Sequence, residues 1–470
     1  MNVGIIGLGP FCRSSYIDYL KKNKDKYSIN IIFLIELKKN SIDVIDFCKK
    51  ENLDIKKYIF LDNDEELSND LNSRTINELK KICSKDLVDI VIISTEPKSH
   101  FKYLRYFIDK NVHILIDKPP VCGFECKIGK TLSKKIIYEA KKINFLLENK
   151  INTKCVVTTQ RRAHTGFLRV KEILSKIVSE YNLPVNYIGC FHSDGMWNMP
   201  DELIYRDNHP YRFGYGKIMH SGYHFIDTMF WLQKLNNNIE KYKINATKFD
   251  CRDFVRNLNN VNYQQLLKTD RFVNLLKNAN LYTGFGELDS HTIFQFKRND
   301  NTVISTVSLN LLQNSFSRRA WDELPKDTYK SNGRLRHEFW NIQIAPVLCV
   351  QIHSSQSYED RNIAEQINFN QGDIGSEDHF DINIFRNKSL IGGKSFEQVK
   401  LGSQEINLMK RARFSIIDQL FQYVSIKTKQ KNNLLESEFS DHLNSIVATA
   451  KIYDLYKVNK YVSRDIQYLS

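Results

Sequence analysis

The chain opens with a short apolar strand pattern that leads directly into a glycine-rich turn and then a helical pattern. Val3–Ile6 forms the strand pattern, and the turn reads Gly7-Leu8-Gly9-Pro10-Phe11-Cys12. The first glycine permits a tight turn, and the second lets backbone N–H groups approach an anion closely. A helix that begins there points its positive end toward the same anion. The pattern predicts a diphosphate-binding turn, and we interpret Cys12, in the third small-residue position, as a packing residue.

The first 120 residues alternate apolar runs with helical patterns. Runs rich in β-branched residues occur at 29–35, 88–94 and 112–116, and an amphipathic helix over 133–149 precedes a further run at 155–159. Strands that are apolar along their whole length are typical of a parallel sheet with helices on both faces. The sequence therefore predicts an α/β domain.

The pattern changes beyond residue 190. Two alternating runs, 292–296 and 303–311, flank a turn at 298–301 and predict an antiparallel hairpin. Helical patterns near 405–423 and 436–456 close the sequence. These features predict an α+β region after the α/β domain.

Two long stretches, 236–290 and 315–380, are polar and without clear periodicity. We expect them to be insertions or extended loops. We predict a dinucleotide-binding domain over residues 1–150, and a substrate-binding α+β domain over residues 151–470 that contains both stretches and a C-terminal helix.

The composition argues against several classes of protein. The 470 residues include 68 Lys and Arg and 54 Asp and Glu, a net charge of +14, with 42% apolar residues, which is typical of a globular chain. The positive charge fits an anionic small-molecule substrate better than nucleic acid, because no basic tract carries interleaved aromatic residues. No apolar run approaches the roughly 20 residues of a membrane-spanning helix. No secretory leader pattern precedes the first strand, so we expect a cytoplasmic protein that binds neither nucleic acid nor membrane.

The nine cysteines are dispersed along the chain without paired C-x-x-C motifs. We therefore expect neither a disulfide framework nor a zinc ribbon, and a reducing compartment fits best. Cys122 and Cys126 lie four residues apart but lack a second pair of ligands, so we predict no metal site there.

An acidic residue follows the second strand pattern. Glu36 stands 27 residues after Gly9, where a carboxylate can accept hydrogen bonds from a ribose diol. Its charge would repel a 2′-phosphate and so favours NAD, whereas Lys38 and Lys39 keep NADP open. The alternative is a solvated glutamate in a charged loop.

Two later segments resemble sequence motifs in which a strand leads into a turn. Asp89–Thr95 leads to His100 and resembles a strand followed by a T-P-x-x-x-H turn, with Glu96 in the place of the proline. Val112–Pro119 resembles a G-K-H-V-L-x-E-K-P segment, with Asp117 in the place of the glutamate.

A third segment completes the set. Gly214–Gly216 and His220–Asp227 resemble a G-G-x-x-x-D-x-G-x-H-x-x-D motif. Gln160–His164 and Leu443–Tyr456 resemble the segment that opens the second domain and the final helix of the same proteins. With the opening turn, these segments resemble in order and spacing the glucose–fructose oxidoreductase / inositol dehydrogenase (Gfo/Idh/MocA) family.

The resemblance implies an NAD(P)-binding Rossmann domain followed by an open, mostly antiparallel sheet that lines the substrate cleft. It also implies hydride transfer between a nicotinamide and a secondary alcohol, usually of a sugar or cyclitol. Lys118 and His224 match the catalytic lysine and histidine of the family. The residues that we assign to binding of NAD or NADP are Gly7, Gly9, Pro10, Phe11, Cys12, Glu36, Ser94, Thr95, His100, Asp117, Lys118 and Arg162.

The expected chemistry suits these residue types. A histidine with a near-neutral pKa can take the proton of a hydroxyl group, and a nearby ammonium can stabilise the developing alkoxide. Lys118 follows a strand, at the carboxyl end where open parallel sheets bind ligands. His220, where the family commonly has Asp, is a third candidate catalytic residue, and this departure leaves the substrate open.

The two histidines also allow other interpretations. His220 and His224 are four residues apart, so on a helix they share a face and with Asp227 could bind zinc. Ser221 stands where an H-E-x-x-H motif has its glutamate, so we predict no metal. A buried histidine with a purely structural role is the remaining alternative.

Arginines occur in pairs in the second domain. Guanidinium groups suit a carboxylate or phosphate of an acidic or nucleotide-linked sugar, although surface solvation is the alternative. The pairs are Arg161 and Arg162, Arg318 and Arg319, and Arg334 and Arg336. Asp194, Trp197 and Tyr211 are further residues that could line the substrate pocket.

Two other functions stay open from the sequence. One is an NAD-dependent glycosidase of the same fold, and the other is a non-catalytic, cofactor-sensing binding protein. The presence of both Lys118 and His224 argues against the second, and the change at His220 argues for it. We also expect a homo-oligomer that forms through the open sheet.

Overall fold

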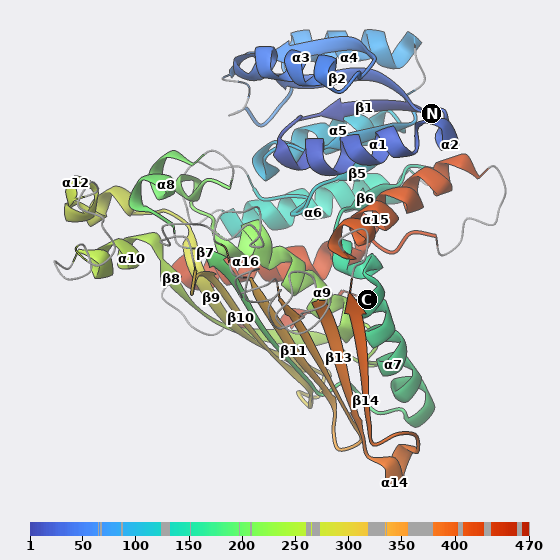
Figure 1. Cartoon of the computed structure of the whole chain (residues 1–470), viewed down its shortest axis with the longest axis vertical. Helices are drawn as coiled ribbons and strands as arrows, with labels where there is room; N and C mark the ends of the chain where they lie inside the picture. Colours follow the sequence, from blue (N-terminus) through green and yellow to red (C-terminus); the bar gives the residue numbers. More distant parts are fainter. Residues whose placement is uncertain are drawn as a thin grey trace, which may run out of the picture. The chain divides into compact units, whose positions relative to one another are not determined.

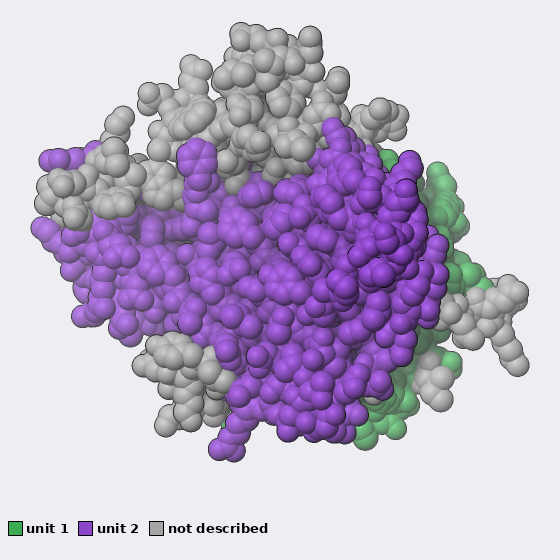
Figure 2. Space-filling model, turned by 90° about the horizontal axis from the view of Figure 1, so that it is seen from below, with its two compact units in different colours: residues 1–124, 134–164, 409–446 green, residues 125–133, 165–408, 447–470 purple. Residues whose placement is uncertain are grey.

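The structure is a computed structural model. It describes residues 1–63, 65, 68–85, 88–123, 132–150, 152–196, 198–206, 209–259, 265, 273–317, 334, 336–355, 379–402, 408–426, 434–457 and 463–469. Two compact units, coloured separately in Figure 2, comprise Met1–Phe124, Lys134–His164 and Met409–Ile446, and Glu125–Ser133, Thr165–Leu408 and Val447–Ser470. The first unit thus takes in residues 409–446, far beyond the predicted domain boundary at residue 150.

The first unit contains a six-stranded parallel sheet with the strand order β3-β2-β1-β4-β5-β6 (Figure 1). The strands are β1 (Asn2–Ile6), β2 (Asn30–Leu37), β3 (Ile55–Leu61), β4 (Ile90–Ile93), β5 (His113–Ile116) and β6 (Cys155–Val157). Every residue of β4 is buried, as expected of a strand covered on both faces. The predicted parallel α/β fold is confirmed.

Helices connect these strands, and one more helix, α15, joins the unit from far along the chain. They are α1 (Asp18–Lys22), α2 (Lys24–Tyr27), α3 (Ser41–Lys50), α4 (Ser73–Lys85), α5 (His100–Asp109), most of α6 (Leu132–Glu148), and α15 (Leu408–Ser425). Shorter helical turns are the π-helical η1 (Cys12–Ile17) and the 3₁₀ turns η2 (Lys38–Asn40), η4 (Pro97–Ser99), η5 (Gln160–Ala163) and η10 (Phe439–His442).

The hydrophobic core of this unit includes residues from the far end of the chain. Tyr16 and Leu34 are buried in one cluster with Ile416, Leu420 and Phe421 of α15. Burial of each such side chain contributes roughly 1.5–3 kcal/mol. Helix α15 is therefore part of the first unit's core, although residues 158–407 separate it from β6.

The second unit is built on a nine-stranded sheet with the order β14-β13-β12-β11-β7-β10-β9-β8-β15 (Figure 1). The strands are β7 (Tyr187–Met196), β8 (Lys241–Asp250), β9 (Glu287–Lys297), β10 (Val303–Asn314), β11 (His337–Ile344), β12 (Leu348–Ser355), β13 (His379–Arg386), β14 (Phe396–Gly402) and β15 (Ile466–Gln467). Strands β7 and β10 are parallel, and the other neighbouring pairs are antiparallel. The predicted large, mostly antiparallel sheet and the predicted β9–β10 hairpin are both confirmed.

The second unit also contains helices, two of which pack on the sheet through aromatic side chains. The helices are α7 (Thr165–Tyr181), α8 (Pro200–Tyr205), α9 (Tyr223–Gln233), α10 (Cys251–Leu258), α12 (Val273–Lys277), α14 (Lys388–Ile391) and most of α16 (Leu443–Lys457), with the 3₁₀ turns η6 (Tyr211–Phe213) and η9 (Ala279–Tyr282) and the π-helical η7 (Ile218–Gly222). The Trp340 ring of β11 lies 5.7 Å from the Phe167 ring of α7 and 6.1 Å from the Phe225 ring of α9, so both helices cover the same face. Among the described helices, none is long and apolar enough to cross a membrane.

Regular strands occupy parts of the two stretches that we expected to be irregular. Strand β8 lies within 236–290, and β11 and β12 lie within 315–380. In β11 the buried Trp340 and Ile342 alternate with Asn341 and Gln343, which are only partly buried. Because only one face of such a strand is covered, half of its residues are polar, and the strand is difficult to distinguish from a polar loop.

The first testable prediction concerns the attachment of α15. The Asp418 carboxylate accepts hydrogen bonds from the Tyr19 hydroxyl at 2.6 Å, the Tyr27 hydroxyl at 2.7 Å and the Lys26 ammonium at 3.0 Å. Asp418→Asn should lower the free energy of unfolding by about 1–3 kcal/mol, because partly buried hydrogen bonds to a charged group become weaker bonds to a neutral amide. Thermal or urea unfolding at neutral pH measures this change.

The effect of Asp418→Asn should depend on pH. Burial alone would raise the pKa of Asp418, but the hydrogen bonds from Tyr19, Tyr27 and Lys26 hold it below its ordinary value. A carboxyl whose pKa is lower in the folded state stabilises fully above its unfolded pKa of about 3.9 and loses this contribution as the pH falls through the folded value. A difference between wild type and variant that stays constant down to pH 3 would contradict the assignment.

Candidate cofactor-binding and catalytic residues

The glycine turn follows β1 at the carboxyl end of the parallel sheet. Gly7 has φ +85°, and its N–H donates to the Ile35 carbonyl at 2.9 Å. A Cβ atom on Gly7 would lie 2.4 Å from the Ser94 carbonyl oxygen, so only glycine fits there. A Cβ atom on Gly9 would instead meet nothing within 4 Å. The space beside Gly9 is thus open, as close approach of a diphosphate to the backbone requires.

The residues after Gly9 begin the first helical turn. Pro10 is exposed, and the Phe11 side chain, 39% exposed, lies edge-on to the Tyr16 ring at 5.6 Å. Cys12 is fully buried, and burial, with the negative charges of Asp117 and Glu36, raises the pKa of its thiol well above the usual value. A protonated, buried thiol is consistent with the packing role that we interpret from the sequence.

Glu36 lies beside the glycine turn. One of its carboxylate oxygens accepts a hydrogen bond from the Leu8 N–H at 2.8 Å. The other accepts from the Leu37 N–H at 2.8 Å and from the Asn40 side-chain amide at 3.2 Å. The carboxylate therefore links the end of β2 to the turn after β1, and it is not a solvated side chain in a loop.

Asp117 connects the ends of three neighbouring strands. Its carboxylate accepts hydrogen bonds from the Ser94 hydroxyl at 2.6 Å, from the Thr158 hydroxyl at 3.2 Å and from the Tyr16 hydroxyl. Burial raises the pKa of Asp117, although these hydrogen bonds and the charge of Lys118 oppose the rise. Lys118, the next residue, is half-buried.

His100 fixes the backbone on both sides of this site. Its Nδ1 atom lies 3.0 Å from the Pro119 carbonyl oxygen, and its Nε2 atom lies 3.1 Å from the Thr95 carbonyl oxygen. The imidazole is fully buried, and burial lowers its pKa to about 4. His100 is therefore neutral at physiological pH, and its contacts join the Lys118–Pro119 segment to Thr95.

Arg162 is occupied within the first unit. Its buried guanidinium donates to the carbonyl oxygens of Glu436 at 3.1 Å and Asp441 at 3.2 Å. These contacts attach η5 to the segment around η10. Its assignment to cofactor binding stays a prediction.

The candidate histidines belong to the second unit. His220 lies in η7, and His224 is the second residue of α9, so the pair spans the junction of a π-turn and a regular helix. The buried His220 ring lies 4.8 Å from His209, 5.1 Å from Tyr211 and 5.8 Å from Tyr215. Among the described residues, no group of three or more His, Cys, Asp or Glu side chains could hold a metal ion.

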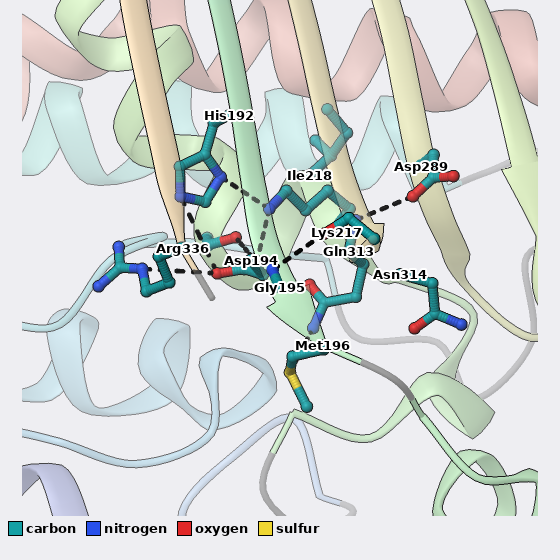
Figure 3. A network of polar contacts seen from close by, with 12 residues as sticks. His192, Asp194, Gly195, Met196, Lys217, Ile218, Asp289, Gln313, Asn314 and Arg336 are labelled. Atoms are coloured by element: carbon teal, nitrogen blue, oxygen red, sulfur yellow. Dashed lines mark hydrogen bonds and ion pairs between the residues drawn. The ribbon is translucent and has the colours of Figure 1, made fainter. Parts of the chain in front are cut away.

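A buried ionic cluster includes two residues that lie close to these histidines in sequence, Lys217 and Ser221 (Figure 3). Asp194 of β7 accepts from the Lys217 ammonium at 2.5 Å and the Ser221 hydroxyl at 2.9 Å. The Arg334 guanidinium donates to the same carboxylate at 2.9 Å, and the Lys217 ammonium also lies 3.0 Å from Nδ1 of His192. Asp194 thus joins β7, the segment before η7 and the segment before β11.

In this cluster several cationic side chains surround one carboxylate. Lys217, Arg334 and Arg336 all lie within 4.0 Å of the Asp194 carboxylate. Burial alone would raise the pKa of Asp194, but Lys217, with His192 and the two arginines, holds it well below its usual value. Burial lowers the pKa of Lys217, although Asp194 opposes this.

Sequence reasoning missed two members of the cluster, His192 and Lys217. The available signal was a lysine in the short run Gly214–Met219, whose other residues are apolar or glycine, because a charge there needs a buried partner. Tyr211 is fully buried, and Arg334 and Arg336 both face Asp194. Other residues of the sequence analysis lie outside the described part of the chain: Cys126, Trp197, Arg318 and Arg319.

The comparisons with known proteins agree with this architecture. Residues 1–126 match the family model GFO_IDH_MocA, described as an oxidoreductase family with an NAD-binding Rossmann fold. No curated protein sequence gives a match.

Solved structures match over nearly the whole chain. Aldose–aldose oxidoreductase from Caulobacter crescentus is 12% identical with a TM-score of 0.57, over 100% of this chain and 99% of that one. UDP-N-acetylglucosamine 3-dehydrogenase GnnA from Acidithiobacillus ferrooxidans is 11% identical with a TM-score of 0.53, over 97% and 98%. The transcriptional regulator Gal80p from Kluyveromyces lactis is 12% identical with a TM-score of 0.54, over 99% and 91%. At these identities the likeness concerns the fold alone. The first 126 residues match the NAD-binding Rossmann model of the Gfo/Idh/MocA oxidoreductases, which confirms the predicted resemblance for that part of the chain, and the whole chain shares the fold of the solved oxidoreductase structures.

Proposed function

We propose that this protein is an NAD(P)-dependent oxidoreductase that transfers hydride between the nicotinamide and a secondary alcohol of a sugar, cyclitol or sugar derivative. The observation that carries the proposal is the glycine turn, in which Gly7 packs against Ser94 while the space beside Gly9 is open. Two of the structurally similar proteins are named as an aldose–aldose oxidoreductase and a UDP-N-acetylglucosamine 3-dehydrogenase. They support an alcohol of the sugar class.

The residues of the turn fit the diphosphate and ribose of a dinucleotide. Backbone N–H groups after Gly9 are proposed to bind the diphosphate at the start of the first helical turn. A carboxylate offers about four acceptor positions, so Glu36 can keep its bonds to Leu8 and Leu37 and still accept from ribose hydroxyls. Its charge favours NAD over NADP. The nicotinamide, when bound, accepts or donates the hydride.

The proposed catalytic roles follow from the chemistry of each side chain. The Lys118 ammonium would stabilise negative charge on the substrate oxygen. His224 would take the hydroxyl proton during oxidation and return it during reduction. His220 is proposed to contact the substrate beside His224, where an imidazole can both donate and accept a hydrogen bond.

A non-catalytic, cofactor-sensing role is the second candidate, and the likeness to the regulator Gal80p favours it. An NAD-dependent glycosidase is the third. Release of a leaving group from a chromogenic glycoside without added reductant would identify the glycosidase. An anionic substrate, association through the open sheet and a cytoplasmic location stay predictions.

The experiment that tests the proposal begins with the bound cofactor. Extraction of the purified protein should yield a nicotinamide dinucleotide, and a screen of polyols and nucleotide sugars should produce a change of absorbance at the reduced-nicotinamide band. Cofactor binding without turnover of any of these compounds would favour the sensing role. Calorimetry that detects no nicotinamide binding would exclude both.

Gly9→Val tests the open side of the turn. The substitution should leave the melting temperature within about 2 °C of wild type, because a Cβ atom at this position meets nothing within 4 Å. It should weaken NAD binding at least about tenfold by filling the space proposed for the diphosphate. Calorimetric titration with NAD measures this, and Gly7→Val, which would clash with Ser94, should unfold the unit instead.

Glu36→Gln tests the preference for NAD. The amide oxygen can still accept from the Leu8 N–H, so this bond to the turn can be kept, while the negative charge and the bond from the Leu37 N–H are lost. We expect the ratio of NAD to NADP affinity to fall by about tenfold, equivalent to about 1.4 kcal/mol. A wild-type protein that already prefers NADP strongly would show that Glu36 is misassigned.

Lys118→Met tests the proposed ammonium. Turnover should fall roughly 10²–10⁴-fold while NAD affinity stays within a few-fold, because the methylene stem remains and only the charge is lost. Lys110→Met, at the exposed end of α5, is the matched control and should retain full activity. Unchanged turnover of the Lys118 variant would remove this residue from the mechanism.

A further inference from the structure

The turn η7, which carries His220 and leads into the helix with His224, is held to the sheet by buried carboxylates on two strands. Asp194 of β7 accepts from Lys217, which precedes η7, and from Ser221, which lies inside it. Glu287 of β9 accepts from the Ile218 N–H at 2.8 Å and from the Tyr453 hydroxyl at 3.0 Å. Each carboxylate thus contacts the turn directly.

The contacts to Asp194 bracket His220. Lys217 lies three residues before this histidine and Ser221 one residue after it, and both donate to the same carboxylate oxygen. A π-helical turn has an uncommon hydrogen-bond pattern that tertiary contacts must support, and such turns are frequent at functional sites. The Asp194 contacts are support of this kind.

The packing of glycines limits movement of the same segment. A Cβ atom on Gly216 would lie 1.8 Å from the Glu287 carbonyl oxygen, and one on Gly286 would lie 2.2 Å from the Tyr215 backbone. The backbone before η7 is therefore pressed against β9, while Lys217 reaches β7 (Figure 3). Contacts to two strands fix the position of the turn. They therefore also fix the orientation of the backbone at His220 and at the start of α9.

We propose that Asp194 is a positioning residue, whose carboxylate, bonded to Lys217 and Ser221, fixes the turn that orients His220 and His224. The inference rests on the proposed function, because orientation of the imidazoles matters for activity only if they serve the reaction. Asp194 itself touches neither substrate nor cofactor in this proposal. Lys217 is its ionic partner, with a side chain that is 0% exposed.

The test uses the full-length protein with Asp194→Asn and with the double variant Asp194→Asn/Lys217→Met. The double variant removes both members of the buried ion pair, so no uncompensated lysine charge remains if the single variant fails to fold. Glu397→Gln, which breaks the 2.9 Å ion pair with Arg386 on β13 and β14, is the matched control in the same unit.

The first readout is the titration of His220 and His224 by NMR of labelled histidine, with the signals assigned from His220→Asn and His224→Asn variants. We expect the midpoint of at least one of the two to shift by roughly half a pH unit or more in the double variant, because the surroundings of the ring change. Glu397→Gln should leave both midpoints unchanged. Unchanged titration of both histidines in the double variant would overturn the proposal.

The second readout is kinetic. With an accepted substrate, kcat of the double variant should fall roughly 10- to 100-fold while NAD affinity stays at the wild-type value, because misplaced catalytic groups slow the chemical step. Wild-type kcat in the double variant would also overturn the proposal. If the wild-type protein binds NAD but turns over no substrate, the proposed function fails, and the histidine titration alone then decides the role of Asp194.

Discussion

The contact between Gly7 and the Ser94 backbone is the constraint on which the ligand-binding edge of the first unit depends. It brings the ends of the neighbouring strands β1 and β4 closer than any residue with a Cβ atom allows. Next to this contact, the Leu8 N–H donates a hydrogen bond to Glu36. The Ser94 hydroxyl donates one to Asp117. One glycine therefore aligns two carboxylates, one proposed for cofactor selection and one that directly precedes Lys118.

The second unit fixes its candidate residues by a different principle. The first unit relies on close backbone packing and on N–H groups that point to Glu36, whereas the second relies on a buried carboxylate surrounded by cations. Lys217 and Arg334 both contact Asp194, and removal of one partner would leave charge buried without compensation. Such a cluster favours one arrangement strongly, because alternative arrangements would expose the same charges to an apolar interior. Because these charges are costly to bury without partners, the segment before the histidines has one strongly favoured conformation.

Whether a strand could be predicted from the sequence depends on how many of its faces are buried. Strands β2 and β4 were predictable because both faces are covered and their residues are apolar throughout, and the β9–β10 hairpin was predictable from its alternation and turn. Strands β8 and β11 were not, since half of each faces away from the core. The π-helical form of η7 and the pairing of Lys217 with Asp194 depend on partners distant in sequence, and no local pattern encodes them. The candidate residues could be named from motifs, but their contacts could not.

The surroundings of His220 suit a histidine at the position where the resembled motif has Asp. Its ring lies among His209, Tyr211 and Tyr215, at centroid distances of 4.8 to 5.8 Å. A carboxylate at this position would have to keep its charge among aromatic rings, which costs free energy, whereas an imidazole can pack against them as another aromatic ring. Histidine at 220 and the aromatic rings around it are therefore mutually dependent. An aspartate placed at 220 alone would not recreate the arrangement that the family motif implies, since the neighbouring rings would also have to change.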